Sequence, residues 1–290
     1  FGYIGKNGIG KSTTIDCIVG LKDYDSGEIL VLGKDVKTQS LEVKEQIGYV
    51  PSETVTYESM TGNEYLQFIG SSYGMIQSSF NKNYNFLLKK FGMNVIDMNR
   101  KIKEYSHGMK QKICLMASLI HNPKVWILDE PTVGLDPSQI REFRSLIRGL
   151  GKKHTVIFSS HILSEVSAIC DRIVVINQGQ VVADTKTSEL SKAITGKSTL
   201  TLEAEGTVTS VTTALKNVHG VQKVTVERQS AENTNVYNIE HESGVDIRKG
   251  VFNAMVNNKS VILTMNEGGM SLEEAYLKLT SKPVSKGGKK

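Results

Sequence analysis

The feature that most constrains this chain is a glycine-rich octapeptide near its beginning. Residues 5–12 read G-K-N-G-I-G-K-S, which fits the pattern G-x-x-x-x-G-K-[ST]. An apolar stretch that predicts a strand, Phe1–Ile4, precedes it, and residues 11–21 after it predict a helix. A glycine-rich turn with a chance lysine is the alternative. The strand and the helix on either side favour a phosphate-binding loop over that alternative.

A loop of this kind would hold a nucleoside triphosphate through a small set of groups. Its glycines allow backbone N–H groups to turn towards phosphate oxygens, and the positive end of the helix dipole adds to the attraction. The Lys11 ammonium would reach the β- and γ-phosphates, while the Ser12 hydroxyl would ligate Mg²⁺. We therefore expect nucleotide contacts from Asn7, Gly8, Gly10, Lys11, Ser12 and Thr13.

A second pattern is an apolar strand that ends in two carboxylates. Residues 125–128 form a continuous apolar run, and Asp129 and Glu130 follow it directly. An enzyme with a phosphate loop needs an acid at the tip of a neighbouring strand to hold Mg²⁺, and Asp129 suits that role. Glu130 would face the γ-phosphate and orient or deprotonate the attacking water as a general base. Two acids that merely end a strand in solvent are the alternative, which the phosphate loop disfavours.

The order of apolar runs predicts the fold class of the first 190 residues. Strand-like runs alternate with helical segments, which is typical of an α/β domain with a parallel sheet. Helical periodicity between the third and fourth of these runs predicts a helical subdomain at about residues 57–105. The expected strands after the first lie at residues 28–32, 47–50, 125–128, 155–159 and 173–176.

The pattern changes after a polar, helical stretch at residues 187–197. Residues 198–281 read strand, helix, strand, strand, helix, strand, with a last helix from about Ser271. This order predicts a ferredoxin-like α+β domain, which could be a ligand sensor, although a fold does not establish a function. Residues 282–290 are rich in lysine and glycine and are expected to form a basic disordered tail.

Composition limits the class of protein further. No apolar run approaches the ~18–20 residues that a membrane-spanning helix needs, so we expect the chain not to cross a bilayer. The three cysteines are scattered and lack metal-ligand spacing, which favours reduced thiols in a core. The net charge of +5 is mild and does not by itself indicate nucleic acid.

With these motifs placed, the chain resembles the ATP-binding subunits of ABC transporters over residues 1 to about 190. The stretch Y-S-H-G-M-K-Q at residues 105–111 resembles the signature of that family, and G-L-D at 134–136 resembles its D-loop. His161, after an expected strand, resembles its switch histidine. The His-Gly-Met form of the signature is similar to that of an exporter-type branch whose ATPases act with a separately encoded permease.

The resemblance implies a P-loop NTPase cassette that hydrolyses ATP in a dimer. Ser106 and the Gly108 N–H would donate to the phosphates of ATP held by a second ATP-binding subunit, either identical or a paralogue. His161 would sense the γ-phosphate, and Asp136 would communicate between the two sites. Hydrolysis would drive an integral membrane permease, with the ATPase on the cytoplasmic face of the cell membrane. A groove beside the helical subdomain would receive a helix of that permease.

Three features of the chain depart from the family pattern. Ser52 and Glu53 stand where the family has a glutamine or an acidic residue that contacts Mg²⁺; either could serve there, and Ser52 is the candidate ligand. His107 replaces the first glycine of the signature. The chain also opens on Phe1 inside a strand, from which we expect a fragment that lacks two strands and an adenine-stacking aromatic residue.

A non-transport ATPase of the same family is the competing hypothesis. Family members that act on ribosomes carry two cassettes in one chain, and those that act on DNA have a long coiled coil inserted in the cassette. This chain has one phosphate loop, and residues 51–105 leave room only for a small helical subdomain. We therefore expect transport, with no nucleic acid partner.

Overall fold

The computed structural model describes residues 1–53, 55–190, 198–242, 245–267 and 276–277. The chain separates into two compact units, Phe1–Asp184 and Thr185–Lys290. The boundaries expected from the sequence, at residues 190 and 198, stay predictions. Among the described residues, no helix combines the length and the apolar character needed to cross a membrane.

The first unit is built on a six-stranded sheet in the order β4-β5-β6-β1-β7-β8. The pairs β4–β5, β5–β6, β6–β1 and β1–β7 are parallel, as strand–helix alternation predicts. The strands of this sheet are β1 (Gly2–Ile4), β4 (Ile47–Val50), β5 (Val125–Asp129), β6 (Thr155–Ser160), β7 (Arg172–Asn177) and β8 (Gln180–Lys186).

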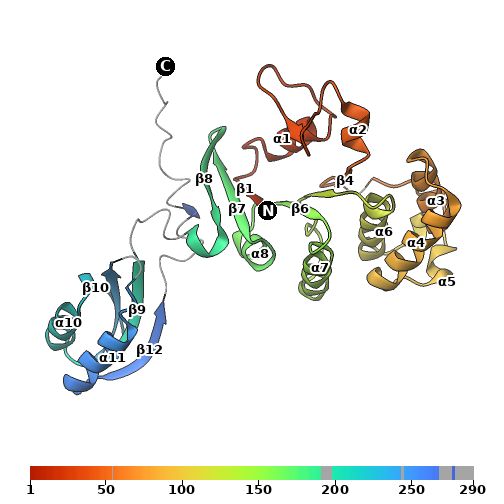
Figure 1. Ribbon diagram of the computed structural model, residues 1–290. Helices are drawn as coiled ribbons and strands as arrows, with labels where there is room; N and C mark the ends of the chain where they lie inside the picture. The colour runs from red at the N-terminus through yellow and green to blue at the C-terminus, as the bar shows by residue number, and fades with distance from the viewer. Residues whose placement is uncertain (54, 191–197, 243–244, 268–275, 278–290) are drawn as a thin grey trace. The chain divides into compact units, whose positions relative to one another are not determined.

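Helices cover both faces of this sheet (Figure 1). On one face, α1 and α2 enclose a core that includes Ile15, Val43 and Ile127. On the other face lie α6, α7 and α8 (Figure 1). Because β5 is buried along its whole length, its apolar run suits a strand that is covered on both faces. The bounds are α1 (Lys11–Ile18), α2 (Ser40–Lys44), α6 (His107–Leu119), α7 (Pro137–Leu150) and α8 (Leu163–Ile169).

A group of helices stands between β4 and α6. It comprises α3 (Gly62–Ser72), α4 (Gln77–Phe91), α5 (Val95–Met98) and a 3-10 turn, Ile102–Glu104. Thr61 begins α3 with a capping box: its side chain accepts from the Glu64 N–H, and the Glu64 carboxylate accepts from the Thr61 N–H. Helix α3 packs against α6, which joins this group to the helix that carries the signature.

Three local expectations differ from the structure. The first helix ends at Ile18 instead of residue 21. The strand expected at residues 28–32 is part of a separate two-stranded sheet, β2 (Leu30–Val31) with β3 (Lys34–Asp35). Leu32 and Gly33 between them both have positive φ, so the chain turns back at once. Strand β8 was not expected: Gln178 and Gly179, again with positive φ, form the turn that leads into it.

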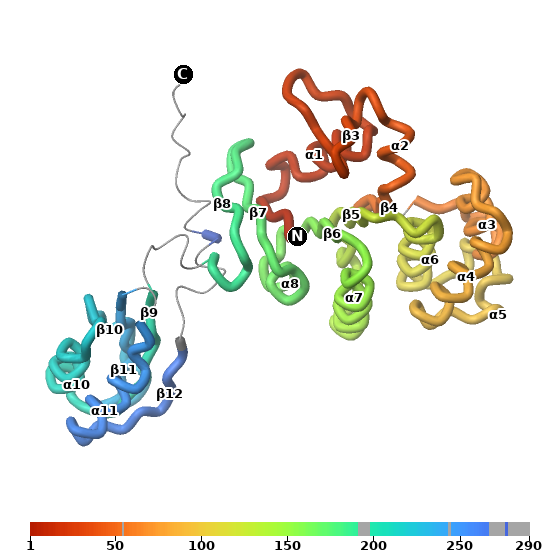
Figure 2. The backbone as a smooth tube through the Cα atoms, viewed as in Figure 1, coloured from red at the N-terminus to blue at the C-terminus, as the bar shows by residue number. Residues whose placement is uncertain are grey.

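The second unit contains the predicted order of strand, helix, strand, strand, helix, strand. Its sheet has the order β10-β11-β9-β12, with every neighbouring pair antiparallel, and Figure 2 shows the traces of β10, β11 and β9. This topology is compatible with the ferredoxin-like expectation. The elements are β9 (Ser198–Glu205), α10 (Val208–Lys216), β10 (Val221–Ala231), β11 (Thr234–His241), α11 (Arg248–Asn257) and β12 (Val261–Glu267).

The core of the second unit lies between its sheet and its two helices. Alternate residues of β9 and β11, such as Leu202 and Tyr237, meet Val211 of α10 and Val251 of α11. The predicted helix from Ser271 falls on residues of which only Tyr276 and Leu277 are described, and the predicted tail at 282–290 lies outside the described residues. The polar stretch after Thr187 begins with a 3-10 turn, Thr187–Glu189.

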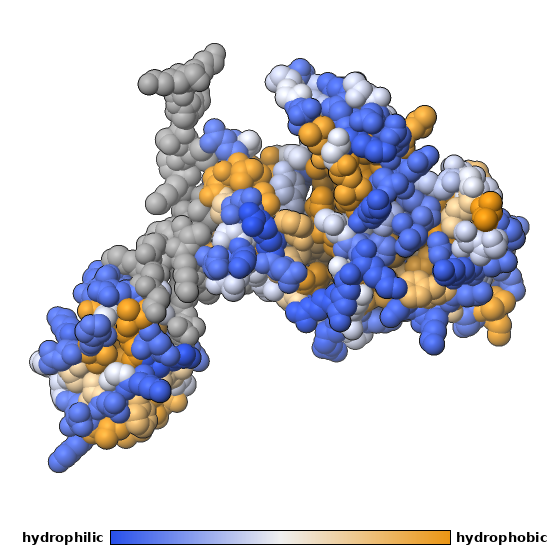
Figure 3. Space-filling view, viewed as in Figure 1, coloured by the Kyte–Doolittle hydropathy of each residue, from blue (hydrophilic) through white to orange (hydrophobic). Residues whose placement is uncertain are grey.

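The surface of the first unit carries some exposed apolar side chains. Four of them, Leu21, Leu30, Leu32 and Leu41, are more than half exposed in the segment that holds α1, β2, β3 and α2. Figure 3 shows hydrophobic side chains among hydrophilic ones over these elements.

Candidate functional site

The phosphate loop connects the carboxyl end of β1 to the start of α1. Gly10 caps this helix with φ of 105°, and no side chain occupies the cap position. Such a φ is accessible to glycine and strained for other residues. The first N–H groups of α1 have no partner within the helix, and the helix dipole makes this end attractive to an anion. The loop therefore has the backbone geometry that a phosphate group requires.

Close packing explains the first glycine of the loop. A Cβ atom on Gly5 would lie 2.6 Å from Cγ2 of Ile9 and 2.9 Å from Cγ1 of Ile176. Neither approach is tolerated, so only glycine fits between the loop and β7. Along the exposed part of the loop and the first turn of α1 lie Asn7, Gly8, Ser12 and Thr13.

Lys11 is the first residue of α1 and is almost completely buried. Its Nζ donates to the carbonyl oxygens of Gly5 at 2.9 Å and Lys6 at 3.4 Å. The same Nζ lies 3.2 Å from Oε1 of Glu130. A buried ammonium needs such partners, because an unpaired charge in the interior is costly. The loop and Glu130 together hold the Lys11 charge in place.

Glu130 follows the last residue of β5 and has an unusual backbone conformation. Its φ is +46°, a left-handed value that costs an ordinary residue about 1–2 kcal/mol. The Glu130 N–H donates to both the hydroxyl oxygen of Ser159, at 2.9 Å, and the carbonyl oxygen of Ser159, at 3.2 Å. These two bonds to β6 hold the strained residue, and its carboxylate is 18% exposed.

The Glu130 carboxylate joins a lysine and a histidine side chain from different elements. Oε1 contacts Lys11, and Oε2 lies 3.1 Å from Nδ1 of His161, in the turn after β6. The His161 side chain is 38% exposed, so it stands at the open side of this group. The structure thus brings together three of the predicted residues, which come from three separate parts of the sequence.

Asp129 is the last residue of β5 and is 1% exposed. The Ser159 hydroxyl donates to its Oδ1, because the register of the parallel pair places Asp129 opposite Ser159. Burial, together with the nearby negative charges of Asp129 and Asp16, raises the pKa of Tyr49 on β4 to about 12. The Ser159 hydroxyl therefore anchors the Asp129 carboxylate at this strand tip by one of its two oxygens.

The donor set beside the loop fits Mg²⁺ held mainly through a nucleotide. Mg²⁺ in such sites takes one or two protein oxygens and completes its shell with phosphates and water. The Asp129 carboxylate and the Ser12 hydroxyl are oxygen ligands of this kind. Among the described residues, no group of three or more His, Cys, Asp or Glu side chains could hold a metal ion by itself. Ser52, the third candidate, is exposed in the turn after β4.

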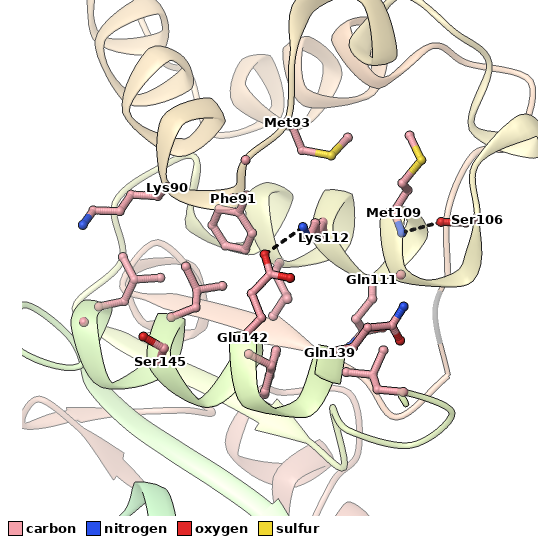
Figure 4. A pocket seen from close by; sticks show the side chains of 18 of the residues that line it. Lys90, Phe91, Met93, Ser106, Met109, Gln111, Lys112, Gln139, Glu142 and Ser145 are labelled. Atoms are coloured by element: carbon pink, nitrogen blue, oxygen red, sulfur yellow. Dashed lines mark hydrogen bonds and ion pairs between the residues drawn. The ribbon is translucent and has the colours of Figure 1, made fainter. Parts of the chain in front are cut away.

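The predicted signature forms the start of α6. Ser106 caps this helix, with its hydroxyl accepting from the Met109 N–H at 3.3 Å. Ser106 and Gly108 line a cavity of about 450 Å³ between the ends of α4 and α6 and the side of α7 (Figure 4). Across this cavity, Lys112 pairs with Glu142 at 3.0 Å (Figure 4).

The predicted D-loop lies against the signature. A Cβ atom on Gly134 would approach Nε2 of His107 to 2.9 Å, and one on Gly108 would approach the Gln139 side chain to 3.0 Å. Asp136 caps α7: its Oδ1 accepts from the N–H groups of Ser138 at 2.8 Å and Gln139 at 2.9 Å. These and related hydrogen bonds lower the pKa of the Asp136 carboxyl. In this structure Asp136 is a helix cap.

A buried set of polar residues, which sequence reasoning missed, supports the predicted signature helix and the segment that carries Asp129 and Glu130. Gln111 of α6 donates from Nε2 to the carbonyl oxygen of Pro131 at 3.0 Å, which links the signature helix to the segment after Glu130. Ser159 holds both acids, and Glu165 of α8 binds the hydroxyl of Thr132. Only a weak signal in the sequence pointed to these supporting residues: Ser159 and Ser160 are polar residues at the end of a mostly apolar strand.

Comparison with known proteins places these features in a family. Residues 1–133 match a family model described as "ABC transporter". The linearmycin resistance ATP-binding protein LnrL of Bacillus subtilis is 36% identical over 227 residues, which cover 78% of this chain and 73% of that protein. The ABC transporter ATP-binding protein NatA of the same organism is 40% identical, covering 62% of this chain and 74% of NatA. A solved ATP-binding subunit of an ABC transporter superposes with a TM-score of 0.60 at 30% identity, over 66% of this chain and 80% of that one.

Proposed function

Because this chain belongs to the family of ABC transporter ATP-binding proteins, whose members are ATPases, we propose that it drives export through a separate membrane permease. ATP is therefore its nucleotide and its fold is the ABC ATPase cassette, with a further unit after residue 184. Beyond this, the roles of individual residues, the metal, the partners and the direction of transport are our proposals.

The observation that carries the mechanism is the position of the Glu130 carboxylate between Lys11 and His161. Lys11 belongs to the phosphate loop and would contact the γ-phosphate, so the Glu130 carboxylate that pairs with Lys11 would lie beside the terminal phosphate of a bound triphosphate. A general base must reach the proton that it removes directly or through one water. Glu130 would accept a proton from the water that attacks the γ-phosphate.

Binding of ATP would rearrange the contacts of Lys11. In this structure its ammonium satisfies its donors with two loop carbonyls and Glu130. Triphosphate oxygens carry more negative charge than carbonyls, so the ammonium would turn to them. This exchange would release one oxygen of Glu130 for the attacking water. The backbone N–H groups of the loop, with Asn7, Gly8, Gly10 and Thr13 around them, would bind the remaining phosphate oxygens.

The Ser12 hydroxyl and the Asp129 carboxylate would hold Mg²⁺ next to the phosphates, with Ser52 as a further candidate. The ion would offset charge on the β- and γ-phosphate oxygens. Asp129 is suited to this role because Ser159 fixes its orientation. His161 would contact the γ-phosphate from the open side, where its ring is partly exposed, while its other nitrogen stays with Glu130.

A second ATP-binding subunit would complete the site. Ser106 and Gly108 lie at the start of α6, where a helix end favours an anion, and would meet the phosphates of ATP on the partner. Asp136 begins α7 beside this signature and would pass the state of one site to the other. Because the γ-phosphate would bridge both subunits, its hydrolysis would weaken the closed dimer.

The proposed work of this cycle is transport. Opening and closing of the dimer would move the permease, and the subunit would be held through that permease at the cytoplasmic face of the membrane. Export is favoured over import by the His-Gly-Met form of the signature and by the likeness to a protein named for linearmycin resistance. The substrate would contact the permease, so this chain would carry no substrate pocket of its own.

The test is Glu130→Gln in the full-length protein. The amide keeps the shape of the side chain but cannot take a proton, so we expect ATP to be bound and not turned over, with a stable ATP-bound dimer. Size-exclusion chromatography with ATP would detect the dimer, and phosphate release would measure turnover. Glu42→Gln, which changes an exposed carboxylate on α2, is the control and should behave like the parent. Normal hydrolysis by Glu130→Gln would refute the assignment of the base.

A further inference from the structure

A buried carboxylate lies just behind the proposed catalytic group. Glu165 belongs to the first turn of α8 and is 3% exposed. Its Oε2 accepts two hydrogen bonds, from Oγ1 of Thr132 at 2.6 Å and from Oγ of Ser160 at 3.1 Å. Burying a carboxylate is costly unless it is hydrogen-bonded, and bonds to an ionised acceptor are stronger than neutral ones. The two hydroxyls thus hold the Glu165 carboxylate in one position, and the carboxylate in turn fixes the two hydroxyls.

The two hydroxyl groups belong to different segments, each next to a residue of the proposed mechanism. Thr132 comes two residues after Glu130, and Ser160 immediately precedes His161. The Ser160 hydroxyl also accepts from the Ile162 N–H at 3.0 Å, so one hydroxyl spans the turn that carries His161. Glu165 is therefore a direct link between the segment after β5 and the turn after β6.

We infer that Glu165 is a positioning residue for ATP hydrolysis: through Thr132 and Ser160 it sets the separation of Glu130 and His161. The inference rests on the roles proposed above for those two residues. Glu165 acts on Glu130 and His161 through the two hydroxyls that it binds. Catalytic groups must be held to within ~0.5 Å of their productive geometry by such supporting bonds.

The expected consequence is a loss of turnover without a loss of nucleotide binding. A displacement of ~1 Å at a reacting group can lower a rate by about 100-fold. Nucleotide affinity depends on the loop between β1 and α1, which Glu165 does not contact by any of these bonds. A residue needed only for folding would instead lower the amount of competent protein and leave the rate at each competent site unchanged.

The test measures kcat and KM for ATP in the full-length protein, with kcat divided by the number of nucleotide-binding sites found by titration. For Glu165→Ala, which removes both bonds, we expect kcat to fall about 10- to 100-fold and KM to stay within about twofold. Glu165→Gln keeps one acceptor oxygen and should recover most of the rate. Ser164→Ala, an exposed change on the same helix, is the control.

Two further variants keep the test decisive if Glu165→Ala does not fold. Thr132→Val and Ser160→Ala each remove one hydroxyl, and each should lower kcat at constant KM. Added to Glu165→Ala, Thr132→Val should cause little further loss, because the two changes break the same bond. Unchanged kcat per binding site in these variants, or fully additive losses, would overturn the inference. If Glu130→Gln abolishes turnover while these variants are normal, the proposed function stands and only the role of Glu165 fails.

Discussion

Oε2 of Glu130 lies 3.1 Å from Nδ1 of His161, although the two residues are 31 positions apart in the chain. The contact exists because β5 and β6 are parallel neighbours, and parallel strands end at the same edge of a sheet. Glu130 follows β5 directly and His161 follows β6 directly. The order of strands therefore brings a carboxylate and an imidazole together beside the phosphate loop.

Replacement of His161 tests this relationship. In His161→Ala, Glu130 keeps its contact with Lys11 and loses its contact with the imidazole. We expect the rate of ATP hydrolysis to fall about 100-fold or more, because a positioned side chain that would contact the γ-phosphate is lost, while ATP still binds. Phosphate release and equilibrium binding of ATP measure the two effects separately. Full activity would contradict the proposed role, and lost binding would indicate that His161 acts on the nucleotide site as a whole.

Replacement of Lys11 tests the phosphate loop itself. Lys11→Ala removes a charged donor that would contact the β- and γ-phosphates, so we expect ATP affinity to fall by about 10- to 100-fold. The partly buried Glu130 carboxylate also loses its cationic partner, which adds a cost to the folded state. Isothermal titration with ATP gives the affinity. Lys22→Ala, a mostly exposed lysine that pairs with Asp16 just after the same helix, is the control. Unaltered affinity in Lys11→Ala would rule out the phosphate-loop assignment.

Stability should depend on pH through His121, at the junction of α6, β4 and α3. Its ring stacks on Tyr73 with the centroids 3.7 Å apart, and its Nε2 lies 3.0 Å from the Ile47 carbonyl oxygen, to which the neutral ring donates. Burial lowers the pKa of His121 to about 4, from an ordinary value of 6.5. Because the pKa of His121 is lower in the folded than in the unfolded protein, neutral His121 contributes to the free energy of unfolding above pH 6.5. This contribution is lost as the pH falls towards 4.

We therefore expect the first unit to lose about 2 kcal/mol of unfolding free energy between pH 7 and pH 5 through His121. His121→Phe keeps an aromatic ring that can stack on Tyr73 and cannot take up a proton. Urea unfolding at the two pH values should show a smaller loss in the variant than in the parent. Equal losses in both proteins would mean that His121 is not buried as the structure has it.

Much of the fold was predictable because its signals are local. The apolar run at residues 125–128 predicted β5 within one residue, since a strand covered on both faces has no polar side to interrupt it. The Ser106 cap likewise marked the start of α6. Strands β3 and β8, each the return strand after a tight turn, escaped prediction. Their turns use Leu32-Gly33 and Gln178-Gly179, and neither pair contains the Asn-Gly or Asp-Gly that usually indicates a two-residue turn.

The sequence by itself determined the chemical groups of the candidate site. The spacing from Gly5 to Ser12 dictates a phosphate loop, and an acid pair after an apolar strand dictates a carboxylate at the sheet edge, because each pattern needs only its own neighbours to form. Only the tertiary structure decided that Glu130 lies between Lys11 and His161, and that Ser159 and Glu165 support it. Those contacts depend on the order and register of β1, β5 and β6, which non-local pairing sets and no local pattern of residues encodes.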